Sequence, residues 1–268
     1  MNKISACLIV RNEEKNIERC LDSLQGVVDE IVLVHDGNCG DATLDIAKKH
    51  GARVFIKNHV GMMEAHLIFA IRQTKGDWVI RIDADEFLSS ELRKDIRSLV
   101  VKAEKENISA YSFRWIDFDI LGNDFISGPE RKAVLFKKCD LYWFSLPHFA
   151  WQSRGKLVEE AYVLGHVISQ KTWFKWLKGR KKWAKIQAKY LLKDFGDLDN
   201  FQAKREDWLK VYSFSRRHAK NPFLAFMKFG KTFSEELFVK KVGIVKSLKR
   251  GVYNFYLGYY LFIYSRKH

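Results

Sequence analysis

The chain has 268 residues, of which 47% are hydrophobic and 29% are charged. This length and balance predict a folded protein with one large domain, or with one domain and an appendage, rather than a disordered chain. The four cysteines lie far apart and form no CxxC pair, which argues against a structural zinc site or a disulfide framework. No apolar run reaches the roughly 18–20 residues of a spanning helix, and no signal peptide is expected.

The net charge of +15 is unevenly distributed along the chain. Residues 1–110 carry 16 Lys and Arg against 18 Asp and Glu, whereas residues 111–268 carry 31 against 14. The second part is also rich in aromatic residues. This asymmetry predicts an anionic partner for the second part, either a nucleic acid or the anionic surface of a membrane.

Short apolar runs alternate with helical patterns through the first hundred residues. The expected strands are 4–10, 31–34, 53–56 and 78–82, and the expected helices are 16–24, 43–50 and 62–74. This alternation predicts a parallel α/β sheet flanked by helices. Strands at 110–118 and 133–136 would continue it as a mixed sheet, and a helical, basic region follows from residue 172. We therefore expect a first domain at 1–170 and a helical region at 171–268 packed on it.

Two carboxylates, Asp83 and Asp85, follow the fourth expected strand. If the chain stays extended, side chains at positions i and i+2 point to the same side. Ligands of parallel sheets bind beyond the carboxyl ends of the strands, and carboxylate oxygens suit Mg²⁺ or Mn²⁺. The alternative is that the acidic residues only lead into the helix that follows.

Two further polar clusters follow the first and second strands. Arg11, Asn12 and Glu13 come after the first strand, and Asp36 ends the second, just before a loop that contains two glycines. Glycines let the backbone approach a ligand closely, and the next helix offers free N–H groups to an anion. The alternative is a plain βα turn in which Asp41 caps the helix.

Together these clusters resemble the family 2 glycosyltransferases of the GT-A fold, a Rossmann-like mixed sheet, and among them bacterial enzymes that build lipopolysaccharide and other cell-surface glycans. The resemblance rests on residues 11–14, on 36–43, and on 76–78 leading to 83–86. It implies a hexosyltransferase that uses a nucleotide-diphosphate sugar, most simply a UDP-sugar. In it Asp36 would contact the base, and Asp83 and Asp85 would bridge Mn²⁺ or Mg²⁺ and the diphosphate.

The chain departs from that family in two places. Cys39 and Gly40 replace a serine–threonine pair of the nucleotide loop. Glu64, His66 and Arg72 occupy the stretch where an Arg–Asn pair often precedes the metal motif. Glu64 and His66 are expected to contact the substrate at this position, and the resemblance does not indicate which sugar they would select.

Later residues resemble the family's catalytic elements. After Gly155 come Glu159 and Glu160, one of which would act as general base in an inverting transfer, and then His166, which would complete the metal site. Inversion needs a carboxylate that takes the proton of the acceptor hydroxyl. The alternatives are a surface acidic pair and a partly buried structural histidine.

Basic, aromatic segments at 172–195 and 252–264 are typical of helices at a membrane interface. We therefore expect a cytoplasmic, peripheral protein on the inner face of the membrane, acting on a saccharide or lipid-linked acceptor in cell-envelope synthesis. A nucleic-acid-binding protein is a rival interpretation, but no such module is recognisable. A nucleotidyltransferase is another, but residues 11–14 lack the glycine that its first loop usually carries.

Overall fold

The computed structural model describes residues 2–60, 62–118, 124–125, 130–145, 151–167, 173–210 and 244–265. The chain divides into two compact units. The first contains residues 1–145, 149–169 and 200–202, and the second contains 146–148, 170–199 and 203–268. The sheet and the predicted site residues belong to the first unit.

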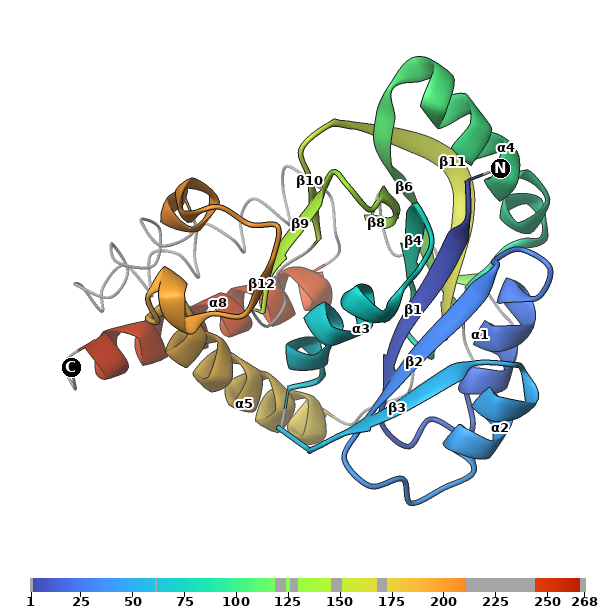
Figure 1. The fold of residues 1–268 in the computed structure, drawn as a ribbon. Helices are drawn as coiled ribbons and strands as arrows, with labels where there is room; N and C mark the ends of the chain where they lie inside the picture. The colour runs from blue at the N-terminus through green and yellow to red at the C-terminus, as the bar shows by residue number, and fades with distance from the viewer. Residues whose placement is uncertain are drawn as a thin grey trace. The chain divides into compact units, whose positions relative to one another are not determined.

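Four parallel strands in the order β3-β2-β1-β4 form one half of the main sheet (Figure 1). The strands are β1 (Ile4–Val10), β2 (Glu30–Asp36), β3 (Arg53–Lys57) and β4 (Trp78–Arg81). The helices between them are α1 (Ile17–Leu24), α2 (Thr43–Lys49), the 3₁₀ turn η1 (Met63–His66) and α3 (Leu67–Gln73). The predicted alternation is confirmed, except that the expected helix 62–74 begins as a 3₁₀ turn and continues as a short α-helix.

The sheet continues beyond β4 as a mixed sheet, as predicted. β8 (Arg131–Lys137) is antiparallel to β4, β6 (Ile108–Phe118) is antiparallel to β8, and β11 (Lys156–Val167) runs parallel to β6. β5 (Glu86–Leu88) pairs with the far side of β11. The remaining elements are α4 (Ser90–Glu106), β7 (Asp124–Phe125), the 3₁₀ turn η2 (Phe195–Asp197) and a small sheet of β9 (Leu141–Phe144), β10 (Gln152–Ser153) and β12 (Asn200–Phe201).

The two faces of the parallel strands bury two separate clusters. Ala6, Leu8 and Val10 of β1 pack with apolar residues of α1, α2 and α4 on one face. Cys7 and Ile9 point the other way and pack with α3, and Figure 1 shows α3 opposite α1 and α2. Because successive side chains of a strand alternate between faces, a run that is apolar throughout fits a strand covered on both sides. The two clusters therefore fix the positions of strands β1–β4, and with them the edge of the sheet at which these strands end.

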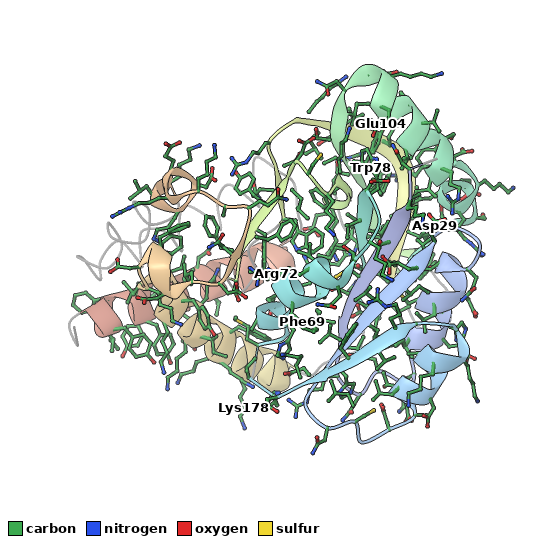
Figure 2. All side chains as sticks on the ribbon, viewed as in Figure 1. Asp29, Phe69, Arg72, Trp78, Glu104 and Lys178 are labelled. Atoms are coloured by element: carbon green, nitrogen blue, oxygen red, sulfur yellow. The ribbon has the colours of Figure 1, made fainter. Side chains whose placement is uncertain are left out.

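Trp78 anchors the start of β4. Its side chain is fully buried, and its indole Nε1 donates to Glu104 Oε1 of α4 at 3.3 Å; Figure 2 labels both residues. The indole also packs against the ring of Tyr111 on β6, with centroids 6.3 Å apart. These contacts tie β4 to α4 and β6, so the residues that follow β4 leave the sheet from a rigid base.

The second unit contains two long helices, α5 (Trp173–Leu191) and α8 (Ile244–Ser265), that pack against each other. Ala184, Ala188 and Leu191 are buried on α5, and Leu257 and Leu261 are buried on α8. Apolar residues three and four positions apart form one face of a helix, which accounts for this pairing. The helices agree with the helical region predicted from residue 172; residues 211–243 lie outside the described part. Among the helices described, none combines the length and hydropathy that crossing a bilayer requires.

Candidate functional site

The acidic residues after β4 form a tight turn. The backbone N–H of Glu86 donates to Asp83 O at 3.0 Å, and the backbone N–H of Asp83 donates to the Glu86 carboxylate at 3.0 Å. The expectation of an extended segment is therefore wrong here, because β5 starts at Glu86 and the chain must reverse before it. As a result Asp83 and Asp85 have different partners.

Asp83 is paired with Lys132, whose side chain is partly buried. Lys132 Nζ lies 2.7 Å from Asp83 Oδ2 and 2.6 Å from Glu86 Oε1, and Glu86 is only 1% exposed. Arg81 lies 3.7 Å from the other oxygen of Asp83. Burial raises the pKa of Asp83, but Lys132 and Arg81 lower it more and hold it well below its usual range. Burial raises the pKa of Glu86, although Lys132 opposes the shift.

Asp85 faces His166 at the end of β11. Asp85 Oδ2 lies 3.4 Å from His166 Nε2, and His166 Nδ1 lies 2.9 Å from Asp117 Oδ1 on β6. The Trp115 ring packs on the imidazole at 4.6 Å between centroids, and its Nε1 donates to Glu86 Oε1 at 2.9 Å. Burial lowers the pKa of His166, but Asp117 and Asp85 outweigh it and raise this pKa to about 9.

The donors at this turn fit a divalent ion held by two protein ligands. Asp85 and His166 offer one carboxylate oxygen and one imidazole nitrogen, while the second imidazole nitrogen is hydrogen-bonded to a carboxylate, as metal-binding histidines usually are. Lys132 already neutralises Asp83, and the described residues contain no cluster of three or more His, Cys, Asp or Glu placed to hold a metal. The predicted set of Asp83, Asp85 and His166 is therefore not gathered as three ligands. Mg²⁺ or Mn²⁺ here would take its other ligands from phosphate and water.

Asp36, at the end of β2, is buried between two histidines. Its Oδ2 accepts from His59 Nδ1 at 2.6 Å, and its Oδ1 accepts from His66 Nε2 at 2.9 Å and from the backbone N–H of Val60 at 3.3 Å. Burial raises the pKa of Asp36, but the bonds from His66 and His59 lower it more, so the group stays ionised. Both oxygens are occupied and the side chain is 1% exposed, so it is His59 that connects Asp36 to the surface.

His59 was missed by sequence reasoning. It lies just after β3, where polar residues are worth testing in any parallel sheet, and its side chain is 40% exposed. Arg11 Nη1 donates to His59 Nε2 at 2.8 Å. Gly37 has φ of +87°, and a Cβ there would meet His59 Cβ at 3.0 Å, so glycine permits both the turn and this packing. Glu64 lies on η1, two residues before His66.

The loop after β1 is bonded to the loop after β2. Asn12, in a left-handed conformation with φ of 54°, donates its backbone N–H to His35 Nε2 at 3.3 Å. Its side-chain oxygen accepts from the backbone N–H of Gly40 at 3.0 Å. The backbone N–H of Glu13 donates to Thr43 Oγ1 at 2.7 Å. The structure thus places Arg11, Asn12 and Glu13 beside the loop that follows Asp36, and their role in binding a substrate stays a prediction.

Asp41 lies one residue before Ala42, the N-cap of α2, so it is not the N-cap itself, but its side chain bonds the start of that helix. Its Oδ1 accepts from the backbone N–H of Thr43, the first residue of α2, at 3.0 Å. Burial raises the pKa of Asp41, but hydrogen bonds from Thr43 outweigh this effect and lower the pKa to about 2. Asp36 and Asp41 therefore have separate roles in one loop.

Glu159 and Glu160 lie on another part of β11. Glu159, 66% exposed, is 3.3 Å from Arg131 Nε, and Glu160 is 3.2 Å from Lys102 Nζ. Glu159 aligns with Ser112 of β6, whereas His166 aligns with Asp117. On β6, Ser112 and Asp117 are five residues apart, which corresponds to about 16 Å along the strand. The structure does not bring the glutamates to the acidic turn, and their role as general base stays a prediction.

Comparison with known proteins decides the family. The family model described as "Glycosyl transferase family 2" matches residues 5–159, more than half of the chain. The chain belongs to glycosyl transferase family 2. The matched residues include Asp36, Asp83 and Asp85 and end before His166. The resemblance on which the sequence analysis relied is thereby confirmed.

Curated relatives of this family 2 member include uncharacterized glycosyltransferases of Rickettsia. That of Rickettsia typhi is 37% identical over 114 residues, which cover 42% of this chain and 38% of the relative. That of Rickettsia bellii is 37% identical over 112 residues, which cover 42% of this chain and 37% of the relative. The chain thus spans just under two fifths of the length of the curated relatives it matches.

Two solved structures are also similar to parts or all of this chain. Staphylococcus aureus TarS 1–349 in complex with UDP matches with a TM-score of 0.44 and 15% identity, covering 99% of this chain and 92% of that one. Mycobacterium tuberculosis glucosyl-3-phosphoglycerate synthase matches with a TM-score of 0.34 and 27% identity, covering 42% of this chain and 45% of that one.

Proposed function

We propose that this chain transfers a sugar from a nucleotide-diphosphate sugar, a UDP-sugar in the first instance, to a saccharide or lipid-linked acceptor with inversion. The observation that carries the proposal is the pair of Asp85 and His166, set at the carboxyl edge of the sheet in a member of glycosyl transferase family 2. The Asp36 cluster ends β2 at the same edge, two strand spacings or about 10 Å from the end of β4.

Each group has a defined task in this proposal. Arg11 and His59 bind the nucleoside part of the donor, and the buried Asp36 orients His59. Asp85 and His166 hold a divalent ion, Mn²⁺ or Mg²⁺, which when bound neutralises the charge of the leaving diphosphate. Lys132 and Arg81 keep Asp83 ionised beside it. Inversion needs a carboxylate base, and Glu159 and Glu160 stay the residues predicted for that step.

The test is a screen for release of nucleoside diphosphate. The purified chain is incubated with a panel of sugar nucleotides and with saccharide or lipid-linked acceptors, in Mn²⁺, in Mg²⁺ and in chelator. The proposal expects release from one donor class that stops in chelator and returns with metal. A nucleotidyltransferase would instead release pyrophosphate from a nucleoside triphosphate and a sugar phosphate. Metal-independent turnover would contradict the metal assignment.

Replacing Asp36 with alanine is expected to weaken nucleoside diphosphate binding about tenfold or more, the worth of one charge-assisted hydrogen bond. The change in kcat at saturating donor should be smaller, because Asp36 orients His59 and does not touch the reacting atoms. Calorimetric titration and steady-state rates measure the two effects. Asp22→Ala is the matched control, since Asp22 Oδ1 bonds a different histidine, His50, at 3.0 Å. Unchanged affinity in Asp36→Ala would remove this cluster from the nucleotide site.

We propose further that the second unit binds the anionic inner face of a membrane. Lys178, labelled in Figure 2, begins a row of exposed lysines along α5 that continues through Lys182, Lys185 and Lys189. Residues spaced by three and four positions share one helix face, and the buried Ala184 and Ala188 lie on another. The row is therefore a continuous basic stripe that no acidic residue of α5 interrupts.

Changing these four lysines to glutamine is expected to lower binding to acidic vesicles by about a hundredfold or more, since each basic residue near anionic lipid is worth roughly 1 kcal/mol. The control changes four exposed lysines of the first unit to glutamine: Lys15, Lys48, Lys94 and Lys105. Vesicle co-sedimentation at rising salt measures the effect, because the attraction is screened within about 10 Å at 0.1 M salt. Equal losses in both variants would contradict a specific face. Retention on oligonucleotides, with log affinity linear in log salt, would support the nucleic-acid alternative.

A further inference from the structure

Asp117 is the penultimate residue of β6 and lies beside the imidazole of His166. Its Oδ1 accepts from His166 Nδ1 at 2.9 Å, and both side chains are 17% exposed. The two residues are register partners of β6 and β11, and the pairing is regular from Val163 to Val167. The contact is therefore fixed by the sheet itself rather than by a mobile loop.

The other sides of His166 are equally constrained. On the far strand it aligns with Glu86 of β5, and the backbone N–H of Val167 donates to Asp85 O at 2.7 Å. The Trp115 ring covers the imidazole. The preceding residue, Gly165, packs against Phe87, whose ring would lie 2.3 Å from any Cβ there. The strand thus holds the imidazole ring between β6 and β5.

This geometry leaves one nitrogen of His166 for a ligand. With Nδ1–H donated to Asp117, the other ring nitrogen, Nε2, faces the carboxylate of Asp85 at 3.4 Å from Oδ2, so a divalent ion bound to both groups would take the place of the Nε2 proton. Metal-binding histidines almost always donate their other N–H to a carboxylate or a carbonyl, which fixes the tautomer and makes the free nitrogen a better ligand. We propose that Asp117 is a positioning residue that presents His166 Nε2 to the divalent ion of the donor site, a role that rests on the proposed function.

The experiment measures Mn²⁺ affinity directly, by the electron paramagnetic resonance signal of free Mn²⁺, with and without UDP. Asp117→Ala is expected to weaken Mn²⁺ binding about 10- to 100-fold. Asp117→Asn should lose less, because an amide oxygen can still accept the Nδ1–H bond. The control is Asp95→Ala. Asp95 lies on α4 and accepts at 2.8 Å from the hydroxyl of Tyr162, which lies on β11 like His166. This variant should leave Mn²⁺ affinity unchanged.

A double-mutant cycle with His166→Ala shows whether Asp117 acts through His166. If it does, Asp117→Ala should have no further effect on Mn²⁺ binding once His166 is replaced. A full additional loss in that background, or equal losses in Asp117→Ala and Asp95→Ala, would overturn the proposal. If the wild-type chain binds no Mn²⁺ even with UDP, the metal assignment of the proposed function fails first, and this inference falls with it. A different outcome separates the two proposals. If the wild-type chain binds Mn²⁺ and Asp117→Ala binds it equally well, the role of Asp117 is overturned and the metal assignment stands.

Discussion

Replacing Asp85 with alanine is expected to reduce sugar transfer about a thousandfold or more while the protein stays folded. In the proposed reaction Asp85 supplies the one carboxylate ligand of the ion that neutralises the leaving diphosphate, and such charge stabilisation is worth several kcal/mol of the barrier. The side chain is 40% exposed and its ion pair with His166 is long, at 3.4 Å. An exposed pair of this kind contributes about 1 kcal/mol or less to stability.

Initial transfer rates and thermal unfolding of the same preparations measure the two effects. Asp77→Ala is the matched control, because Asp77 is an exposed aspartate at the opposite end of β4, where its carboxylate accepts from the backbone N–H of Lys3 at 3.1 Å. That variant should transfer sugar at the wild-type rate. Near-normal turnover of Asp85→Ala, after chelation and with metal added back, would show that Asp85 is not a metal ligand.

Asp83 is less suitable for this test. Its carboxylate neutralises Lys132, which also bonds the buried Glu86. Removing Asp83 would therefore remove one of the two counter-ions of Lys132 as well as change the donor site, and a loss of activity could come from either. Asp85 has no such link, since its ion-pair partner is the His166 side chain at the end of β11.

The first four strands could be predicted because each element carries its own pattern. The run Ile4–Val10 is buried on both faces, and α1 buries Ile17, Cys20, Leu21 and Leu24 at helical spacing. Polar residues just after such strands must meet at one edge, which is why Arg11 and Asp36 were identified together. His59 follows the third strand in the same way, and the same rule would have found it.

The acidic turn could not be read from local sequence. The direction of Asp83 and Asp85 depends on β5, a strand of three residues that pairs with β11 nearly eighty residues later. Lys132 and Asp117 reach the turn from β8 and β6, which were expected as strands but without a register. A charged residue at the edge of a predicted strand usually faces solvent, so nothing in Arg131–Lys137 marked Lys132 as the counter-ion of a buried glutamate.

Lys132, the counter-ion of the buried Glu86, carries the largest stability effect we expect. Lys132→Met should destabilise the first unit by about 3–5 kcal/mol, because removing one partner of a buried ion pair leaves an uncompensated charge. Glu86 is the group left behind: it is 1% exposed, it accepts from Trp115 Nε1, and burial already raises its pKa. Denaturant unfolding followed by circular dichroism measures the loss as a lower midpoint.

A second lysine of the same strand provides the comparison. Lys137 Nζ pairs with Glu104 Oε2 at 2.9 Å, but these side chains are 28% and 38% exposed, so Lys137→Met should cost about 1 kcal/mol or less. Adding Glu86→Gln to Lys132→Met should recover part of the loss, because the amide removes the unpaired charge and keeps an acceptor for Trp115. If Lys132→Met were as stable as Lys137→Met, or if Glu86→Gln deepened the loss, then Lys132 would not be the counter-ion that lets the chain bury Glu86 next to its acidic turn.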